Sequence, residues 1–224
     1  MNGNSVLSAA IDFPPYPRLE APHRSAFCLI KRTLDIGGAL LGLLIFAIIF
    51  IPVAIAIKLD SPGSILYQQV RYGLQGRPMI IRKFRSMVQN ADALKNSIPN
   101  EAQGLIFKNK QDPRVTRVGR LLRKTSLDEF PQFWNVLVGE MSLVGTRPPT
   151  HDEVVQYSDR HWKRLNVKPG LTGEWQVNGR SAVQDFEEIV DLDLRYQVLW
   201  SPLYDLGIIL RTVAVLLTKR AGAY

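Results

Sequence analysis

The stretch IGGALLGLLIFAIIFIPVAIAI, residues 36–57, runs for 22 positions without a charged side chain. As a helix rising about 1.5 Å per residue it would be roughly 33 Å long, enough to cross the hydrocarbon core of a bilayer. The run begins too late and is too long to be the apolar part of a cleaved signal peptide. Residues 36–57 therefore predict a helix that inserts in a membrane.

The residues around this run bear on how it lies in the membrane. Lys31 and Arg32 precede it and Lys58 follows it, and such basic residues concentrate on the cytoplasmic side of membrane segments. Pro52 removes a backbone donor inside the run and favours a kink. These features favour a re-entrant, kinked membrane helix over residues 31–60, with both ends on one face. A single span with a tolerated proline is the alternative, and physical reasoning alone leaves both open.

The rest of the chain predicts an α+β, helix-dominated fold. Residues 1–30 contain four prolines and predict a flexible N-terminal tail, whereas residues 61–224 predict one cytoplasmic catalytic domain. A β-hairpin is expected from Ser64–Val70 and Met79–Phe84, and a further short strand from Glu174–Val177. The expected helices cover Val115–Lys124, Glu129–Val138, Val183–Gln197 and Leu203–Leu217. The last has one apolar face and basic neighbours, which suits an amphipathic helix in the membrane interface; an ordinary helix packed on the core is the alternative.

Composition narrows the class of partner. The net charge of +8 and the 28 lysines and arginines predict an anionic partner, which composition alone does not identify. No helix-turn-helix, zinc finger or aromatic-basic sheet pattern is present, so a nucleic-acid partner is not predicted. Cys28 is the only cysteine and the three histidines lack zinc-site spacing, which fits a reduced, cytoplasmic environment.

Two acidic residues form the most conspicuous catalytic candidate. Asp128 and Glu129 precede Pro131, which has no N–H and fits best in the donor-free first turn of a helix. That placement puts Asp128 at the positive end of a helix, where an ionised carboxylate is favoured and phosphate can bind. Asp128 and Glu129 are thus candidates for a nucleophile and its helper, with simple helix capping as the alternative.

Several other groups are candidates for binding phosphate or metal. Arginines recur every third residue from Arg114 to Arg123, which suits phosphate binding, although a solvated basic face is the alternative. Arg147 lies in a loop stiffened by two prolines, and Arg180 follows a tight Asn-Gly turn. An Asp-x-Asp sequence ending at Asp193 resembles the metal-binding pair of many nucleotide-sugar transferases, but residues two apart on a helix point in different directions.

Six blocks of the chain resemble the bacterial sugar transferases, the monotopic polyprenol-phosphate phosphoglycosyl transferases that prime exopolysaccharide, capsule and glycan assembly. Together they cover about residues 31 to 224. The blocks are KRTLDI (31–36), KLDSPGS (58–64), KFRSM (83–87), DPRVTRVGRLLRKTSLDEFPQFWNVLVGEMSLVGTRP (112–148), KPGLTGEWQVNGRS (168–181) and LDLRY (192–196).

The resemblance implies a two-step, Mg²⁺-dependent reaction on the cytoplasmic face of the bacterial inner membrane. A hexose-1-phosphate passes from a UDP-sugar to polyprenyl (undecaprenyl) phosphate, with release of UMP. Asp128 matches the nucleophile that carries the phosphosugar, and Glu129 matches the second acid of the dyad. Arg123 and Arg147 match phosphate ligands, and Asp193, with Asp128, is the expected metal ligand.

Two departures from the family pattern concern the membrane helix and the sugar. Ile51 stands where the family usually has a serine before the helix-breaking proline, and that proline lies about one turn later. Thr146 replaces the first proline of a common Gly-Pro-Arg-Pro sequence, which resembles the subset that primes with glucose or galactose phosphate. A non-catalytic, basic, membrane-anchored binding or scaffold protein is the alternative function. The sequence specifies no oligomeric state.

Overall fold

A computed structural model describes residues 20–179 and 183–218 of the 224-residue chain. Helices dominate, and the named strands pair in two small two-stranded sheets, so the predicted helix-dominated α+β class is confirmed. In chain order, with η for 3₁₀ helices, the elements are η1 (Arg24–Phe27), α2 (Leu29–Asp60), β1 (Leu66–Tyr72), η2 (Leu74–Gly76), β2 (Pro78–Phe84), η3 (Lys95–Ser97), α3 (Arg117–Thr125), η4 (Leu127–Gln132), α4 (Phe133–Val138), β3 (Ser142–Val144), α5 (His151–Val154), α6 (Asp159–Trp162), η5 (Lys163–Asn166), β4 (Gly170–Thr172), α7 (Glu174–Val177), α8 (Phe186–Leu199) and α9 (Pro202–Leu217).

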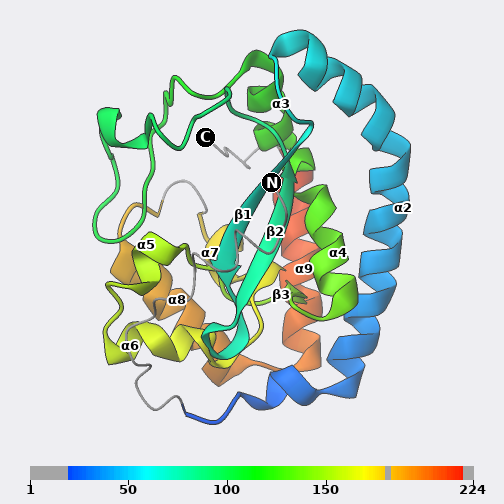
Figure 1. Ribbon diagram of the computed structural model, residues 1–224. Coiled ribbons are helices and arrows are strands. Elements are labelled where there is room, and N and C mark those ends of the chain that lie inside the picture. Colours follow the sequence, from blue (N-terminus) through cyan, green and yellow to red (C-terminus); the bar gives the residue numbers. More distant parts are fainter. Residues whose placement is uncertain (1–19, 180–182, 219–224) are drawn as a thin grey trace.

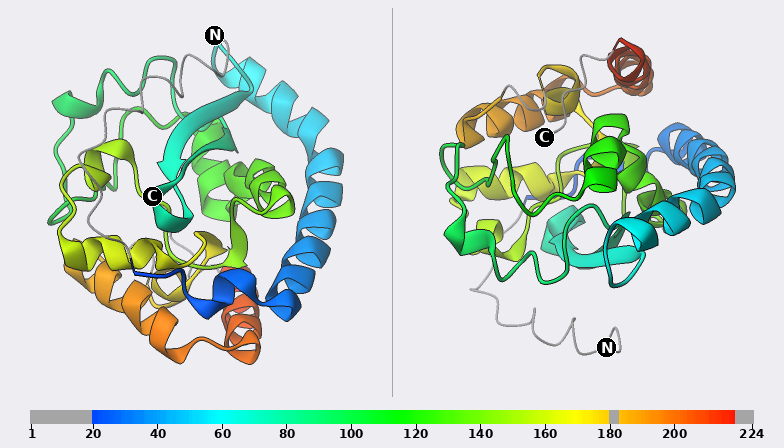
Figure 2. Two further views of the ribbon diagram at one scale, coloured as in Figure 1. Left: turned by 60° about the horizontal axis from the view of Figure 1, so that its bottom comes forward. Right: turned by 90° about the horizontal axis from the view of Figure 1, so that it is seen from above.

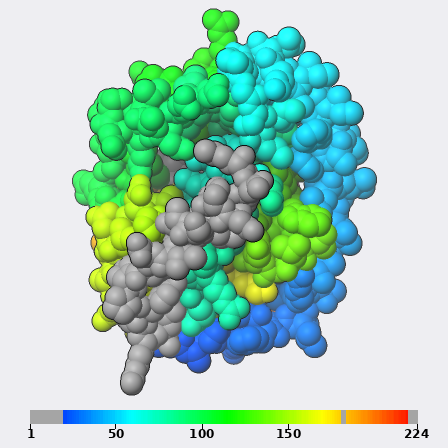
Figure 3. Space-filling model, viewed as in Figure 1, coloured from blue at the N-terminus to red at the C-terminus, as the bar shows by residue number. Residues whose placement is uncertain are grey.

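The apolar run forms most of α2, a continuous helix of 32 residues with Pro52 inside it. It curves along one side of the molecule towards α3 (Figure 1) and forms a ridge on that edge in the space-filling view (Figure 3). Within the described residues it is the one helix long and apolar enough to cross a membrane. Seven of its large apolar side chains are between 55% and 69% exposed: Ile30, Leu40, Leu41, Leu44, Ile48, Ile51 and Ile55.

Both ends of α2 are bonded to the same domain. Near its start, Lys31 Nζ lies 2.6 Å from Asp205 Oδ2 of α9, and both side chains are buried. At its end, Asp60 accepts a hydrogen bond of 2.9 Å from the Val118 N–H in the first turn of α3. Between these ends, the lack of a Cβ at Gly42 allows α4 to pack directly against the helix. Consequently α2 lies along the domain instead of projecting from it.

The predicted hairpin is confirmed and orients three polar side chains in one direction. β1 and β2 are antiparallel, with Tyr67 opposite Lys83 and Arg71 opposite Met79. Opposed residues of an antiparallel pair lie on the same face, and so do residues two apart on one strand. Lys83, Gln69 and Arg71 therefore share one face of the hairpin. The C-terminal helices α8 and α9 lie on the other side of the domain from the hairpin (Figure 2).

One predicted element was wrong, and one pairing was not anticipated. Glu174–Val177 was expected to be a strand but forms the short helix α7. The strand lies just before it, at Gly170–Thr172, and pairs in parallel with Ser142–Val144. Strand propensity is weak evidence beside such pairing, because tertiary context decides which short segment enters a sheet. This pairing places the loop around Arg147 and the start of α7 at the same edge.

The N-terminal tail expected over residues 1–30 is only partly within the described residues, since residues 1–19 lie outside them. The described portion is bound to the domain. The His23 N–H donates to the Asn166 carbonyl at 2.8 Å, and the Arg24 guanidinium lies over the Trp200 ring at 5.4 Å from its centre. The tail prediction therefore does not extend to residues 23–28, which hold the start of α2 against the C-terminal helices.

Candidate active site

Asp128 and Glu129 lie in η4, the turn between α3 and α4, which packs against β2. Ser126 comes just before it in the left-handed conformation, with φ of +56°, which is uncommon for a residue with a side chain. This conformation ends α3 abruptly and turns the chain back, so that Arg123 and Asp128 lie close together. Asp128 is buried with 6% of its surface exposed, whereas Glu129 is half-buried.

The expected helix cap at Asp128 is not found. Asp128 is the second residue of the 3₁₀ turn Leu127–Gln132, and α4 begins only at Phe133. Pro131 lies inside that turn. Because proline has no N–H to donate, it favours the start of the α-helix after it. The alternative capping box is absent as well, since the Ser126 side chain makes no capping hydrogen bond to the turn. Capping therefore does not account for the acidic pair.

Two cations lie beside the acidic pair. Lys83 Nζ is 2.7 Å from Glu129 Oε1, with a little over a quarter of each side chain exposed. Arg123 Nε donates to Ser86 Oγ at 2.9 Å. Burial lowers the pKa of Arg123, and the carboxylate of Asp128 opposes this shift because the two charges are close enough to attract each other. The site thus combines two carboxylates with a lysine and an arginine.

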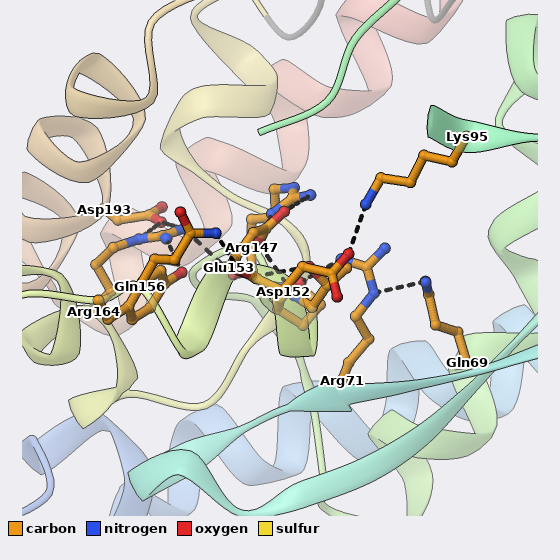
Figure 4. A network of polar contacts seen from close by, with 12 residues as sticks. Gln69, Arg71, Lys95, Arg147, Asp152, Glu153, Gln156, Arg164 and Asp193 are labelled. Carbon is orange, nitrogen blue, oxygen red and sulfur yellow. Dashed lines mark hydrogen bonds and ion pairs between the residues drawn. The ribbon is translucent and has the colours of Figure 1, made fainter. Parts of the chain in front are cut away.

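A second cluster surrounds Arg147, which Figure 4 shows close to Arg71, Glu153 and Arg164. Arg147 makes two hydrogen bonds to the Glu153 carboxylate, at 2.8 and 2.9 Å. Arg71 Nη1 donates to the Pro148 carbonyl at 2.9 Å. Burial would raise the pKa of Glu153, but the charge and hydrogen bonds of Arg147, with the charge of Arg71 and the Thr150 N–H, together outweigh it and lower the pKa. Arg147 is therefore positioned by a carboxylate within the protein.

Arg71 connects the two clusters electrostatically. Burial, together with the neighbouring charge of Arg147, lowers the pKa of Arg71 to about 10, while the carboxylates of Glu153 and Glu129 oppose the shift. The guanidinium groups of Arg71 and Arg147 repel each other, and an anion bound between or beside them would relieve this repulsion. Arg71 and Lys83 lie on the same face of the hairpin. Through Lys83 this face contacts the acidic pair, and through Arg71 it contacts the arginine cluster.

The proposed metal ligand Asp193 lies in a different environment from the one expected. It is 1% exposed and accepts two hydrogen bonds from Arg164, at 2.8 and 2.6 Å. Its neighbour in the Asp-x-Asp sequence, Asp191, pairs with Arg160 on the surface, so the two carboxylates serve separate partners. Within residues 20–179 and 183–218, no three His, Cys, Asp or Glu side chains lie together as a metal site.

The structure separates the arginines that recur from Arg114 to Arg123. Arg114 is buried and paired with Asp112 at 2.7 Å, which is a structural role. Arg123 donates to Ser86 beside the acidic pair, whereas Arg117 and Arg120 are exposed. The three-residue spacing therefore does not form one phosphate site. Arg180 lies outside the described residues, so its expected role stays a prediction.

Sequence reasoning missed four residues of these clusters: Lys83, Arg71, Glu153 and Arg164. Lys83 lies in a block that supported the family resemblance, but no role followed from the block alone. A signal for Lys83 and Arg71 was available in the predicted hairpin, since its register places them on one face. Glu153 and Arg164 had no comparable signal. Glu153 pairs with Arg147 in the irregular loop after β3, and Arg164 pairs with Asp193 in the distant helix α8, so neither contact follows from local spacing.

Comparison with known proteins gives consistent matches. The profile of a family described as "Bacterial sugar transferase" matches residues 26–219. The galactosyl transferase CpsE of Streptococcus agalactiae is 46% identical over 96% of this chain and 46% of its own length. The undecaprenyl-phosphate galactose phosphotransferase of Salmonella typhimurium is 42% identical over 87% of this chain and 42% of its own.

A third relative is covered more fully. The UDP-glucose:undecaprenyl-phosphate glucose-1-phosphate transferase of Caulobacter vibrioides is 44% identical over 87% of this chain and 72% of its own length. The chain spans less than half the length of the Streptococcus and Salmonella relatives that it matches. The family match over residues 26–219 includes both clusters.

Proposed function

The chain belongs to the bacterial sugar transferase family, and we propose that it transfers a hexose-1-phosphate from a UDP-sugar to undecaprenyl phosphate. Names of the relatives support glucose or galactose as the sugar. The product would be a polyprenyl-diphospho-sugar, which begins the synthesis of an exopolysaccharide or another surface glycan. The observation that carries the proposal is the buried Asp128, which lies beside Arg123 and next to a glutamate held by Lys83.

In the first step, a carboxylate oxygen of Asp128 attacks the sugar-bearing phosphorus of the UDP-sugar. A bond forms between that oxygen and phosphorus, and the bond to the bridging oxygen breaks, so UMP leaves with the electron pair. In the second step, an oxygen of undecaprenyl phosphate attacks the same phosphorus and releases the aspartate. Arg123 and the Arg71–Arg147 cluster would hold phosphate oxygens in line, because phosphoryl transfer depends on positioning and charge neutralisation.

The acidic pair also fits the Mg²⁺ that the family resemblance implies. Magnesium is commonly bound by one or two carboxylates together with substrate phosphates, so a cluster of three protein ligands is not required. Asp128 and Glu129 would hold it, and it would neutralise charge on the diphosphate and on UMP as it leaves. Asp193 fits less well, because the Arg164 guanidinium binds its carboxylate; we assign it to positioning Arg164 next to the Arg147 loop.

We place the protein at the bacterial inner membrane, with the domain on the cytoplasmic face and α2 as a re-entrant helix. The attachment of both ends of α2 to one domain supports this, because a helix perpendicular to the bilayer would separate its ends by about 30 Å across the membrane. Exposed apolar residues also lie on α4, which packs against α2, and on α9. They include Trp134, Val138, Leu203, Leu210 and Leu217.

The proposal is tested by incubating the purified protein with a UDP-sugar, Mg²⁺ and undecaprenyl phosphate, and measuring release of UMP. UDP-glucose and UDP-galactose should give the highest rates in a panel of UDP-sugars. A non-catalytic scaffold protein would release no UMP with any of them, and that result would contradict the proposal.

A further inference from the structure

Four residues of α3 form a stripe that the proposed reaction leaves unused. Arg117, Arg120, Leu121 and Lys124 are all exposed, and Leu121 is 60% exposed. Spacings of three and four residues place them on one side of a helix. The opposite side is buried, since Gly119 and Leu122 pack inward, and Arg123 lies beside the acidic pair. The stripe therefore does not take part in the active site.

The stripe adjoins the apolar surface of α2. Lys58 and Leu59 at the end of α2 are both exposed, Leu59 by 84%. Asp60 then bonds to the Val118 N–H, which fixes the start of α3 against the end of α2 (Figure 1). The exposed apolar face of α2 thus continues into a border where basic residues flank Leu59 and Leu121. Apolar side chains next to basic ones are typical of protein surfaces that bind a membrane interface.

We propose that the α3 stripe, with Lys58, binds the anionic headgroups of membrane phospholipids. Within the described residues, its four cations form no ion pair of the kind that joins Arg114 to Asp112 inside the domain; the charges of Arg117 and Arg120 act only on the nearby carboxylate of Asp60. Leu59 and Leu121 would insert between headgroups, while the lysine and arginine groups remain at phosphate level. Because α3 ends at Arg123 and the acidic pair, this contact would also fix the height of the active site above the bilayer.

The test compares vesicles of phosphatidylcholine with vesicles that contain about a third phosphatidylglycerol, both without polyprenyl phosphate, so binding through the substrate does not contribute. The double variant Arg117→Gln/Lys124→Gln removes two charges of the stripe. Its matched control is Arg77→Gln/Arg195→Gln, which removes two other exposed charges. Arg77 follows η2 and Arg195 lies on α8, and both elements are at the end of the domain away from α3 (Figure 1). Binding of detergent-purified protein is measured by vesicle flotation, and folding by circular dichroism.

The wild type should bind anionic vesicles more tightly than neutral ones. The stripe variant should lose about 25-fold of its affinity for anionic vesicles, or about fivefold per basic residue removed, and keep its affinity for neutral ones. The control variant should keep both. Raising NaCl from about 0.1 to 1 M should remove the anionic preference of the wild type. Equal losses in both variants would indicate a general effect of net charge, and an unchanged stripe variant would exclude the site; either result overturns the proposal.

Discussion

Lys83 donates from Nζ to Glu129 Oε1 at 2.7 Å, which joins the second strand of the hairpin to the acidic pair. This bond restricts the orientation of the Glu129 carboxylate. Because the side chains are only partly buried, this pair contributes little to the free energy of unfolding. We expect its main role to be the orientation of Glu129 within the acidic pair.

Replacing Lys83 with glutamine should therefore weaken Mg²⁺-dependent activity more than stability. Groups that orient metal-binding side chains typically contribute about 10- to 100-fold, so the Mg²⁺ concentration for half-maximal UMP release should rise by about tenfold or more. Titration of Mg²⁺ at fixed UDP-sugar measures this. Lys83→Arg keeps the charge and should retain most of the activity. An unchanged Mg²⁺ requirement in Lys83→Gln would exclude this orienting role.

The bidentate bond between Arg147 and Glu153 leads to a second prediction. Arg147→Lys keeps the charge but loses the planar, two-pronged geometry, so the substitution should lower both thermal stability and kcat/KM. The loss of stability is expected because the substitution weakens the pairing of the buried Glu153 carboxylate. Breaking a buried pair costs up to about 3–5 kcal/mol, and an arginine with one fifth of its side chain exposed should cost less.

The variant Glu153→Gln separates the two effects of Arg147. It removes the internal partner but keeps the guanidinium available for phosphate. Both variants should melt earlier, but at a temperature where both remain folded Arg147→Lys should have the lower kcat/KM. Equal losses of kcat/KM in the two variants would mean that Arg147 acts only through the structure of its loop.

The lowered pKa of Glu153 also predicts a dependence of stability on pH. A carboxylate with a lower pKa in the folded state contributes stability above its ordinary pKa of 4.5, and the contribution disappears as pH falls through the folded value. The melting temperature of the wild type should therefore fall more steeply than that of Glu153→Gln between about pH 5 and pH 3. Thermal melts in detergent across this range measure the difference, and parallel curves would contradict it.

The attachment of α2 at both ends predicts that its flanks lie on one side of the membrane. Ala21 and Ser64 are exposed and flank the helix, so each is suited to a single cysteine in a Cys28→Ser background. In intact cells both cysteines should resist a membrane-impermeant thiol reagent, and after lysis both should react. Labelling of residue 21 alone from outside the cell would establish a span and exclude the re-entrant placement.

The sequence predicted those parts of the fold that depend on local pattern. Residues 36–57 predicted the long apolar helix α2, and two strand-like runs predicted the hairpin, because each prediction rests on the pattern within one short segment. The parallel pairing of β3 with β4 joins segments about 28 residues apart, and three-residue strands carry too little pattern to reveal it. The same limit applies to Asp193, since its fully buried partner Arg164 comes from a distant turn.

The chemistry proposed for the acidic pair makes Asp128 the covalent nucleophile and leaves Glu129 as its helper. Asp128 is buried beside Arg123, which favours an ionised carboxylate next to a phosphate site. Incubation with UDP-sugar and Mg²⁺, without undecaprenyl phosphate, should add one phosphosugar to the peptide that contains Asp128, as measured by mass spectrometry. Undecaprenyl phosphate added afterwards should remove this mass, because the second step releases the aspartate.

The variant Asp128→Asn nearly preserves the size of the side chain, and since Asp128 caps no helix, folding should survive the change. An amide forms no acyl-phosphate, so turnover should fall by at least about 10³-fold, as expected when a covalent nucleophile is removed. Glu129→Gln should slow the reaction while the adduct still forms on Asp128. If the adduct maps to another residue, or if Asp128→Asn turns over at a rate near that of the wild type, then Asp128 is not the nucleophile and the two-step mechanism fails.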